Sequence, residues 1–221
     1  MILAVDTTTN VLSVAVTEGR RVLSEYSIDH KRTHSQKLMP VIEAVLGNLG
    51  VDISEIDAFV AAAGPGSFTG IRIGLAAVRT LAQATGKKVA AVNTLLSLAY
   101  NAEFTKGRVL AVLDARGGNV YAAVYSFRGK AHKCVLEPMF ISIEALNGYL
   151  SGLRGKTYAV GDTAGIENIT VLGGTFDRPR ASSAAFAAEA EGNFGDINSA
   201  AAVYINKPQA QRELEEREKN K

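Results

Sequence analysis

A strand–aspartate–turn–strand pattern occurs twice in the sequence, about half a chain length apart, and it limits the folds open to this protein. Residues 2–16 start with the apolar run Ile-Leu-Ala-Val, pass through Asp6-Thr-Thr-Thr-Asn10 and continue with a second apolar run. Residues 109–125 repeat the scheme around Asp114-Ala-Arg-Gly-Gly-Asn119. Each aspartate ends one β-rich run and a tight turn leads into the next, so both segments predict β-hairpins. The repeat predicts duplicated domains with similar sheets, and 221 residues suffice for two small domains.

Helices and strands alternate after each hairpin. The periodicity predicts strands over 21–28, 57–63 and 88–92 in the first half and over 133–141 and 157–160 in the second. It predicts helices over 35–48, 70–85, 94–104, 143–150 and 182–191, and a charged helix from about 208. Antiparallel hairpins followed by strand–helix–strand crossovers indicate an α/β fold with mixed sheets and helices on their faces. The region of Gly107 is the expected boundary, giving domains 1–106 and 107–221, with the terminal helix able to pack back on the first.

A glycine-rich segment, Gly64-Pro-Gly-Ser-Phe-Thr-Gly-Ile-Arg-Ile-Gly74, lies between a predicted strand and a predicted helix. Glycines permit positive φ and close backbone approach, and exposed N–H groups at a helix start could hold an anion. The spacing matches neither the dinucleotide fingerprint nor a P-loop, because no Lys-Ser/Thr pair follows. Ser67 or Thr69 could equally cap the helix. We favour capping and packing over phosphate binding, and both remain open at this stage.

The helix after this segment has a narrow polar face. Arg72, Arg79 and Gln83 are its main polar residues, whereas a helix that flanks one small sheet usually has a wide polar face. The pattern therefore predicts burial on two sides, against the helix's own sheet and against either the neighbouring helix or a partner protein. If a partner covers it, the predicted interface comes from residues 34–49 and 70–86 and contains His34, Leu38, Ile42, Ile71, Ile73, Leu75, Ala77, Val78 and Leu81.

Charge and cysteine content narrow the function classes. The 24 basic and 22 acidic side chains give a net charge of +2, too balanced to hold nucleic acid by the overall field alone. The single cysteine, Cys134, excludes an intramolecular disulfide and fits a reducing compartment. No apolar run reaches the roughly 18 residues that a membrane span needs, and the N-terminus lacks the features of a secretion signal. We expect a cytoplasmic protein without a membrane contact.

Several segments together resemble one family. Residues 2–9, 64–74 and 113–121 are similar to the corresponding motifs of the TsaB family, also called YeaZ, and the ending from Val203 to Leu214 is similar to that family's close. The resemblance covers essentially the whole chain. It implies the actin/hexokinase/Hsp70-like (ASKHA) fold, with two duplicated βββαβαβα-type domains of which the second is reduced. It also implies a role in forming threonylcarbamoyladenosine beside the anticodon of tRNAs that read codons starting with A.

The resemblance further implies partners. In that family the subunit pairs with a TsaD-like catalytic paralogue, a TsaE-like ATPase joins them, and the isolated subunit forms a homodimer. Transfer chemistry belongs to TsaD, so tRNA would be met only through the complex. Catalytic relatives hold a metal through two histidines four residues apart, where this sequence has Thr94 and Leu98. Leucine cannot ligate a metal and threonine alone is a poor ligand, so we expect no metal site and no catalytic residues.

A nucleotide site is the least determined feature. The implied fold would place Asp6, Thr7, Asp114 and Gly161 at the cleft where related ATPases bind nucleotide, which leaves an ATP-dependent phosphotransferase or ATPase as the alternative function. The Asp6 turn lacks a glycine and a nearby lysine, and both aspartates could instead stabilise turns. We expect no intrinsic cofactor, with ATP or ADP held at a joint site in the complex.

Two further readings concern a protease and the tail. A metalloprotease would need a ligand set such as His-Glu-x-x-His, which the sequence lacks. The mixed-charge tail, residues 211–221, is either a solvated helix end or a docking segment for a third subunit.

Overall fold

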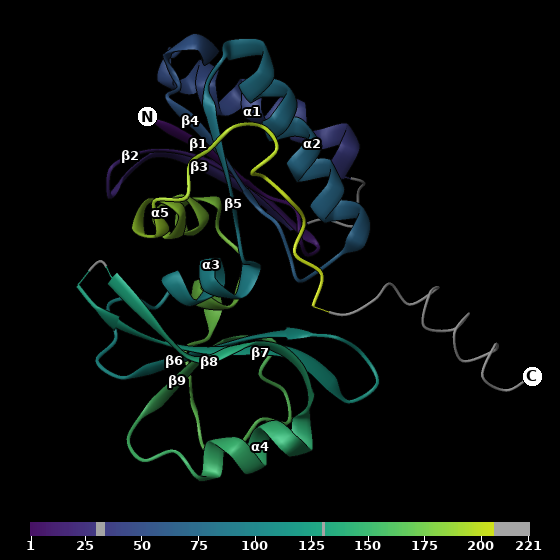
Figure 1. Ribbon diagram of the computed structural model, residues 1–221, viewed down its shortest axis with the longest axis vertical. Coiled ribbons are helices and arrows are strands. Elements are labelled where there is room, and N and C mark those ends of the chain that lie inside the picture. Colours follow the sequence, from purple (N-terminus) through teal and green to yellow (C-terminus); the bar gives the residue numbers. More distant parts are fainter. Residues whose placement is uncertain (30–33, 130, 206–221) are drawn as a thin grey trace, which may run out of the picture.

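Two five-stranded mixed sheets face each other across a layer of two helices (Figure 1). The computed structural model describes residues 1–29, 34–129 and 131–205. The predicted tail helix therefore lies outside the described residues. No helix in the described part of the chain is long and apolar enough to cross a bilayer.

The first sheet has the order β3-β2-β1-β4-β5. Its strands are β1 (Ile2–Asp6), β2 (Val11–Glu18), β3 (Arg21–Asp29), β4 (Ala58–Ala62) and β5 (Lys88–Val92). The first three are antiparallel neighbours, whereas β1, β4 and β5 are parallel because helices connect them. Two helices, α1 (His34–Leu49) and α2 (Phe68–Thr85), cover its outer face, and a short 3-10 helix (Ile53–Glu55) leads into β4.

The second sheet repeats this arrangement with the order β10-β9-β6-β7-β8. Its strands are β6 (Arg108–Asp114), β7 (Asn119–Arg128), β8 (Ala131–Ser142), β9 (Thr157–Gly161) and β10 (Thr170–Val171). A single helix, α4 (Ile143–Ser151), covers its outer face, and a short 3-10 helix (Gly174–Asp177) follows β10. The matching order reflects the internal repeat, although the edge strand β10 has two residues where its counterpart β5 has five.

The layer between the sheets consists of α3 (Thr94–Tyr100) and α5 (Ala181–Glu191). Every residue of α3 is buried, and α5 packs on it through a run of buried alanines. One continuous hydrophobic cluster joins both helices to the inner faces of both sheets, for example Val60 of the first and Val109 of the second. The two halves therefore share a core instead of meeting only at their surfaces.

The strands of the two sheets fall on either side of Gly107, but residues 181–205 return to the first sheet. Helix α5 packs against β1, β2, β4 and β5, and Val89 of β5 pairs with Gly195. The predicted helix over 94–104 is too long: α3 ends at Tyr100, and turns follow it up to β6.

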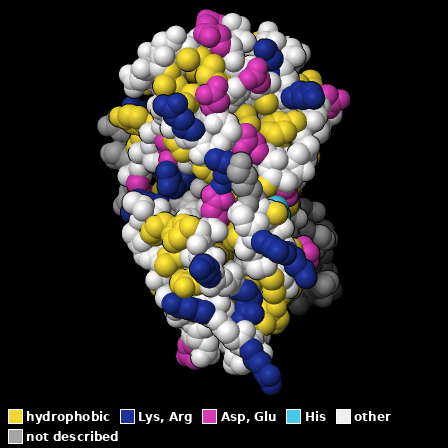
Figure 2. Space-filling model, turned by 90° about the vertical axis from the view of Figure 1, so that its left-hand side faces the viewer, with side chains coloured by type: hydrophobic (Ala, Val, Ile, Leu, Met, Phe, Trp, Pro, Cys, Tyr) yellow, Lys and Arg dark blue, Asp and Glu magenta, His cyan; other side chains and the backbone are white. Residues whose placement is uncertain are grey.

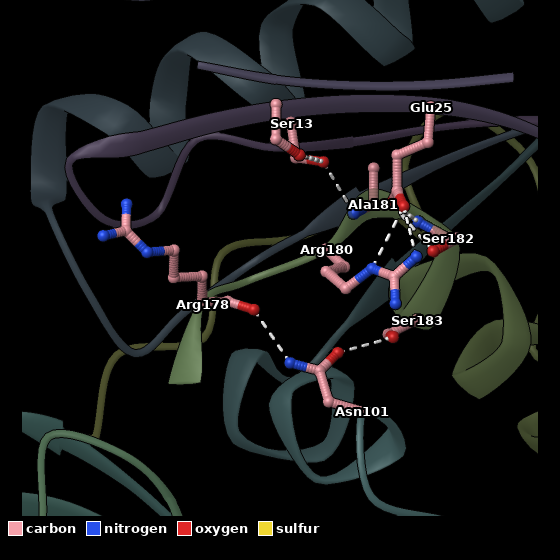
Figure 3. A network of polar contacts seen from close by, with 9 residues as sticks. Ser13, Glu25, Asn101, Arg178, Arg180, Ala181, Ser182 and Ser183 are labelled. Atoms are coloured by element: carbon pink, nitrogen blue, oxygen red, sulfur yellow. Dashed lines mark hydrogen bonds and ion pairs between the residues drawn. The ribbon is translucent and has the colours of Figure 1, made fainter. Parts of the chain in front are cut away.

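A polar network holds the start of α5 against the first sheet (Figure 3). The helix's N-cap residue, Arg180, makes no side-chain cap, and the Glu25 carboxylate of β3 takes that role by accepting from Ser182 N at 3.0 Å and Ser182 Oγ at 2.7 Å. Its other oxygen accepts from Arg180 Nε at 3.0 Å and Nη2 at 2.6 Å. Ser13 Oγ accepts from Ala181 N at 3.0 Å. Carboxylates at a helix N-terminus are favoured by the helix dipole, so this contact positions α5.

A second branch of the network joins the same segment to α3. Asn101 Nδ2 donates to the carbonyl oxygens of Phe176 and Arg178, at 2.9 and 2.8 Å, and Ser183 Oγ donates to Asn101 Oδ1 at 2.7 Å. The peripheral ion pair between Arg178 and Asp29 is more exposed, with 56% and 47% of the two side chains accessible.

The network predicts that removing either of two carboxylates lowers the free energy of unfolding by unequal amounts. Glu25→Ala leaves Arg180 and the first turn of α5 without their acceptor, and we expect it to lower the free energy of unfolding by about 2–3 kcal/mol. Asp29→Ala removes an exposed ion pair and should cost under about 1 kcal/mol. Urea denaturation of both variants measures the difference. Equal losses would contradict the assigned role of Glu25.

Candidate functional site

An open cavity of about 600 Å³ lies between the two hairpin turns, next to the start of α2. Four segments line it: the first hairpin turn, the loop before α2, the second hairpin turn and a C-terminal segment. The lining residues include Thr8–Asn10, 65–68, Leu113–Arg116, Tyr121, Asp162 and 203–205. Of the predicted nucleotide-site residues, Asp114 lines the cavity. Asp6 and Thr7 are fully buried beside the lining residue Thr8, and Gly161 precedes the lining residue Asp162.

The Asp6 carboxylate is buried and closes the first hairpin turn. Its Oδ1 accepts from Thr8 N at 2.9 Å and from Thr8 Oγ1 at 2.7 Å. The other oxygen, Oδ2, has no hydrogen-bond partner among the residues that the structure describes. Burial raises the pKa of Asp6 from 3.8 to about 6, against the opposing effects of the Thr8 hydrogen bonds and His34. The carboxylate therefore stabilises the turn at the cost of leaving one oxygen unsatisfied.

The glycines of the 64–74 segment lie directly against this turn. A Cβ at Gly70 would overlap the carbonyl oxygen of Thr7, and one at Gly74 would lie 2.6 Å from Thr7 Oγ1. Thr7 Oγ1 donates to the carbonyl oxygen of Gly70 at 2.7 Å, and Ser67 N donates to that of Thr8 at 2.6 Å. Ser67 Oγ caps the helix by accepting from Gly70 N. Close packing and capping thus account for these residues.

The second hairpin turn presents its aspartate to the cavity. Asp114 Oδ1 accepts from Arg116 N, and Asp114 N donates to Asp162 Oδ2, both at 2.9 Å. Gly161 has a φ of 93°, and a Cβ there would overlap the carbonyl oxygen of Val112, so a side chain is excluded by packing. Its N–H donates to Asp177 Oδ1 at 3.3 Å, and burial raises the pKa of Asp177.

No group of three or more His, Cys, Asp or Glu residues is placed to hold a metal ion within the described ranges.

Positions 94 and 98, where the family resemblance implies histidines for a metal site, are occupied by buried side chains. Thr94 Oγ1 accepts from Gly64 N at 3.0 Å. Leu98 is fully buried, and its Cδ2 lies 2.8 Å from where a Cβ at Gly161 would be. Both side chains help to join the first sheet to the second.

The nine predicted partner-interface residues separate into two groups. Five are buried in the core beneath α1 and α2 and present almost no surface: Leu38, Ile42, Ile71, Leu75 and Val78. The other four are half-buried: His34, Ile73, Ala77 and Leu81. Helix α1 packs against α2, so the neighbouring helix supplies part of the second contact that the narrow polar face predicted.

The exposed side of α2 contains its polar residues Arg72, Arg79 and Gln83 together with small residues outside the predicted interface. These small residues include Ala76, Thr80 and Ala84, and the exposed side of α1 includes Met39 and Ala44. The small size of the α2 residues is visible in the sequence, but which of its alanines face outward depends on how α2 is rotated against its sheet.

A C-terminal segment that crosses the cavity was also missed. Val203 N donates to the carbonyl oxygen of Ala63 at 2.8 Å, and the Tyr204 ring lies 5.0 Å from the Phe68 ring. The apolar pattern of Val203-Tyr-Ile was the available signal, but its pairing partner is 140 residues away.

The buried Asp6 predicts a pH-dependent stability difference. The folded state binds the Asp6 proton more tightly than the unfolded state, so its contribution to stability is full below about pH 4 and is lost as the pH rises to about 6. Relative to Asp6→Asn, the wild type should lose on the order of 2–3 kcal/mol between pH 4 and pH 7. Urea denaturation of both proteins across this range measures the change. A difference that does not vary with pH would contradict the raised pKa.

The close approach at Gly70 predicts opposite effects for two glycine substitutions. Gly70→Ala forces α2 away from the hairpin turn and should cost about 1–3 kcal/mol of unfolding free energy. Gly47→Ala is the control, because that helical glycine has open space around it and alanine should gain about 0.5–1 kcal/mol. Thermal unfolding of both variants provides the measurement, and a neutral Gly70→Ala would disprove the packing account.

Sequence and structure comparisons place the chain among known proteins. The model of the family described as "TsaD: tRNA N6-adenosine threonylcarbamoyltransferase" matches residues 21–211. The Escherichia coli "tRNA threonylcarbamoyladenosine biosynthesis protein TsaB" is 34% identical over 168 residues, covering 72% of this chain and 70% of that protein. The Bacillus subtilis protein of the same description is 35% identical over 127 residues, which span 58% of this chain and only 56% of the relative.

A solved structure, "YeaZ from Pseudomonas aeruginosa", shares the fold with a TM-score of 0.79 and 29% identity, covering 92% of this chain and 98% of that one. The predicted ASKHA-type α/β fold is confirmed by this likeness together with the duplicated sheets. The resemblance drawn from the motifs is likewise confirmed: the chain belongs to the TsaB/YeaZ group within the TsaD family.

Proposed function

We propose that this chain is a non-catalytic partner subunit of the machinery that forms threonylcarbamoyladenosine in tRNA. In this proposal it acts in the cytoplasm, pairs with a TsaD-type transferase and is joined by a TsaE-type ATPase. The proposal is supported by the relatives, which carry the description "tRNA threonylcarbamoyladenosine biosynthesis protein TsaB". A subunit of this kind meets tRNA through the complex and needs no metal of its own.

The observation that carries the non-catalytic part is the use of Thr94 and Leu98. A metal site at these positions would need imidazoles that reach an open space. Instead, Thr94 is hydrogen-bonded to the backbone of Gly64 and Leu98 is packed against Gly161. Both side chains have 0% exposure. Replacing them with histidines would therefore disturb the shared core and would not create an accessible metal site.

The exposed side of α2 is the surface we propose for pairing. This side carries Arg72, Arg79 and Gln83. The side chains beside them at Ala76, Thr80 and Ala84 are small and uncharged, and they let another helix approach closely. An interface built here and on the outer side of α1 would need to bury at least roughly 1,000 Å² in total to be stable. The isolated chain would use the same surface to form a homodimer.

Co-purification with a TsaD-type paralogue tests the pairing. Ala77→Glu is a poor test because Ala77 packs partly against the core, whereas Ala76→Glu places the charge in solvent and should leave the fold intact. We expect Ala76→Glu to abolish the complex, because an interface core does not accommodate an unpaired carboxylate. Ala164→Glu, an exposed alanine in the second half, is the matched control and should pair normally.

The co-purification results test the proposed surface and the proposed subunit role separately. Loss of pairing in Ala76→Glu alone supports the proposed surface. Pairing that survives in both variants places the interface elsewhere on the molecule. Failure of the wild-type chain to pair at all would overturn the subunit proposal.

The alternative, an ATP-dependent phosphotransferase or ATPase of the same fold, stays a prediction for the cavity. The two aspartates predicted for a nucleotide site differ in accessibility: Asp114 lines the cavity, whereas Asp6 is enclosed by its own turn. Calorimetry with magnesium-ATP, on the isolated chain and on the complex, distinguishes the readings. Binding only to the complex supports a joint nucleotide site, and turnover by the isolated chain favours the phosphotransferase.

A further inference from the structure

The second sheet carries opposite charges at the two ends of its strands. Asp114 ends β6 and Asp162 follows β9, and both line the cavity. At the other end of the strands, the segments 106–109, 126–133 and 154–158 contain no aspartate or glutamate. The basic residues that the structure describes in these segments form a group that we call the basic end: Lys106, Arg108, Arg128, Lys133, Arg154 and Lys156. A strong local charge therefore exists in a chain whose net charge is only +2.

Strand pairing brings the residues of the basic end together. Thr157 of β9 pairs with Arg108 of β6. Ser126 of β7 pairs with both Arg108 and Lys133 of β8. Neighbouring strands lie about 4.8 Å apart, so the basic end extends roughly 14 Å across four strands. Figure 2 looks onto this end of the molecule, and dark blue Lys and Arg side chains gather in its lower half, over the second sheet.

Arg108 fixes the loop that carries Arg154 and Lys156. Its Nη2 donates to the carbonyl oxygen of Arg154 and to that of Gly155, the latter at 3.2 Å. Its Nε donates to Thr157 Oγ1 at 3.4 Å. The guanidinium is thus used on the backbone beside it, and it places two further cations at the start of β9.

The other charges of the basic end are available to a partner. All of its residues except Arg108 are exposed, and none of the six forms an ion pair with another described residue. Lys156 Nζ instead lies 4.6 Å from the centroid of the Tyr158 ring, which holds the ammonium without neutralising it. A cluster of unpaired cations attracts a polyanion, because binding releases the counterions of the polyanion.

An accessible aromatic side chain lies next to the basic end in the sequence. Phe104, two residues before Lys106, is 65% exposed and is the most exposed large hydrophobic residue in the described part of the chain. Its ring centroid lies 5.5 Å from that of Phe176. Cations combined with accessible aromatic rings are typical of surfaces that bind single-stranded nucleic acid, because the cations contact phosphates and the bases stack on the rings. An acidic protein would match the charge alone.

We propose that the basic end binds the phosphate backbone of an RNA strand, with Phe104 available to stack on an unpaired base. Arg108 and Asp114 stand six residues apart on β6, or about 20 Å, so this surface is separate from the cavity. The choice of RNA among polyanions rests on the proposed function. To that function it adds a direct contact between this chain and tRNA.

Binding of a tRNA transcript to the isolated chain, followed by fluorescence anisotropy at several salt concentrations, tests the surface. If about four phosphates are contacted, log K should fall with log salt with a slope of about −3. Arg154→Gln combined with Lys156→Gln should reduce this slope by about 2 and weaken binding about 10- to 30-fold at about 0.1 M salt. Lys87→Gln combined with Lys88→Gln is the matched control, since it removes the same charge beside β5 of the first sheet and should leave binding unchanged.

A second variant separates stacking from charge. Phe104→Ala should weaken binding of a single-stranded RNA by about fivefold to a hundredfold and leave the salt slope unchanged, because stacking releases no counterions. Tyr26→Ala is the matched control, since Tyr26 is 50% exposed on β3 of the first sheet.

Three results would overturn the proposal. The first is no binding at about 0.1 mM, which is the weak limit for non-specific nucleic-acid contacts. The second is an equal loss of binding in the two double variants. The third is binding to anionic phospholipid vesicles that is as tight as binding to RNA, which would assign the basic end to a membrane surface. All three are measured without a partner protein, so they are distinct from a failure to pair with the TsaD-type paralogue, which concerns the proposed function alone.

Discussion

The rest of the structure depends on the apolar contact that α3 and α5 make with both sheets at once. Ordinary two-domain proteins keep separate cores and a polar interface between them. Here one hydrophobic cluster runs from the inner face of the first sheet through both helices to the second. The Glu25 carboxylate then holds the start of α5 in place from β3. Moving the halves apart would expose this cluster, so the cavity between the hairpin turns has a width set by core packing.

Close packing also engages the residues that flank the cavity. The first hairpin turn packs against the glycines of the 64–74 segment, and Gly70 closely approaches Thr7. Thr94 accepts a hydrogen bond from Gly64, and Leu98 packs against Gly161. The outer side of α1 and α2, which we propose for pairing, remains accessible, and Tyr204 at the cavity is 44% exposed.

Much of the fold could be predicted from the sequence, because most strands and helices have local signals, such as the two Asp-turn hairpins and Gly86 in the left-handed conformation that ends α2. The two-residue strand β10 has no such signal and was not predicted. The site was less accessible, since it depends on long-range packing. Leu38 and Val78 have the same apolar character as interface residues, and only the rotation of each helix shows that they are core. Tyr204 meets Phe68 across 136 residues of sequence, and no local pattern encodes such a contact.

We propose that this chain contributes surfaces, and not chemistry, to tRNA modification. Mass spectrometry of tRNA nucleosides tests it most directly, after incubation with the TsaD-type transferase, the TsaE-type ATPase, the activated threonylcarbamoyl donor and ATP. The account predicts threonylcarbamoyladenosine from the full mixture, a strong loss when this chain is omitted, and none from this chain with donor and tRNA alone. Product from the chain by itself, or full yield without it, would contradict the account.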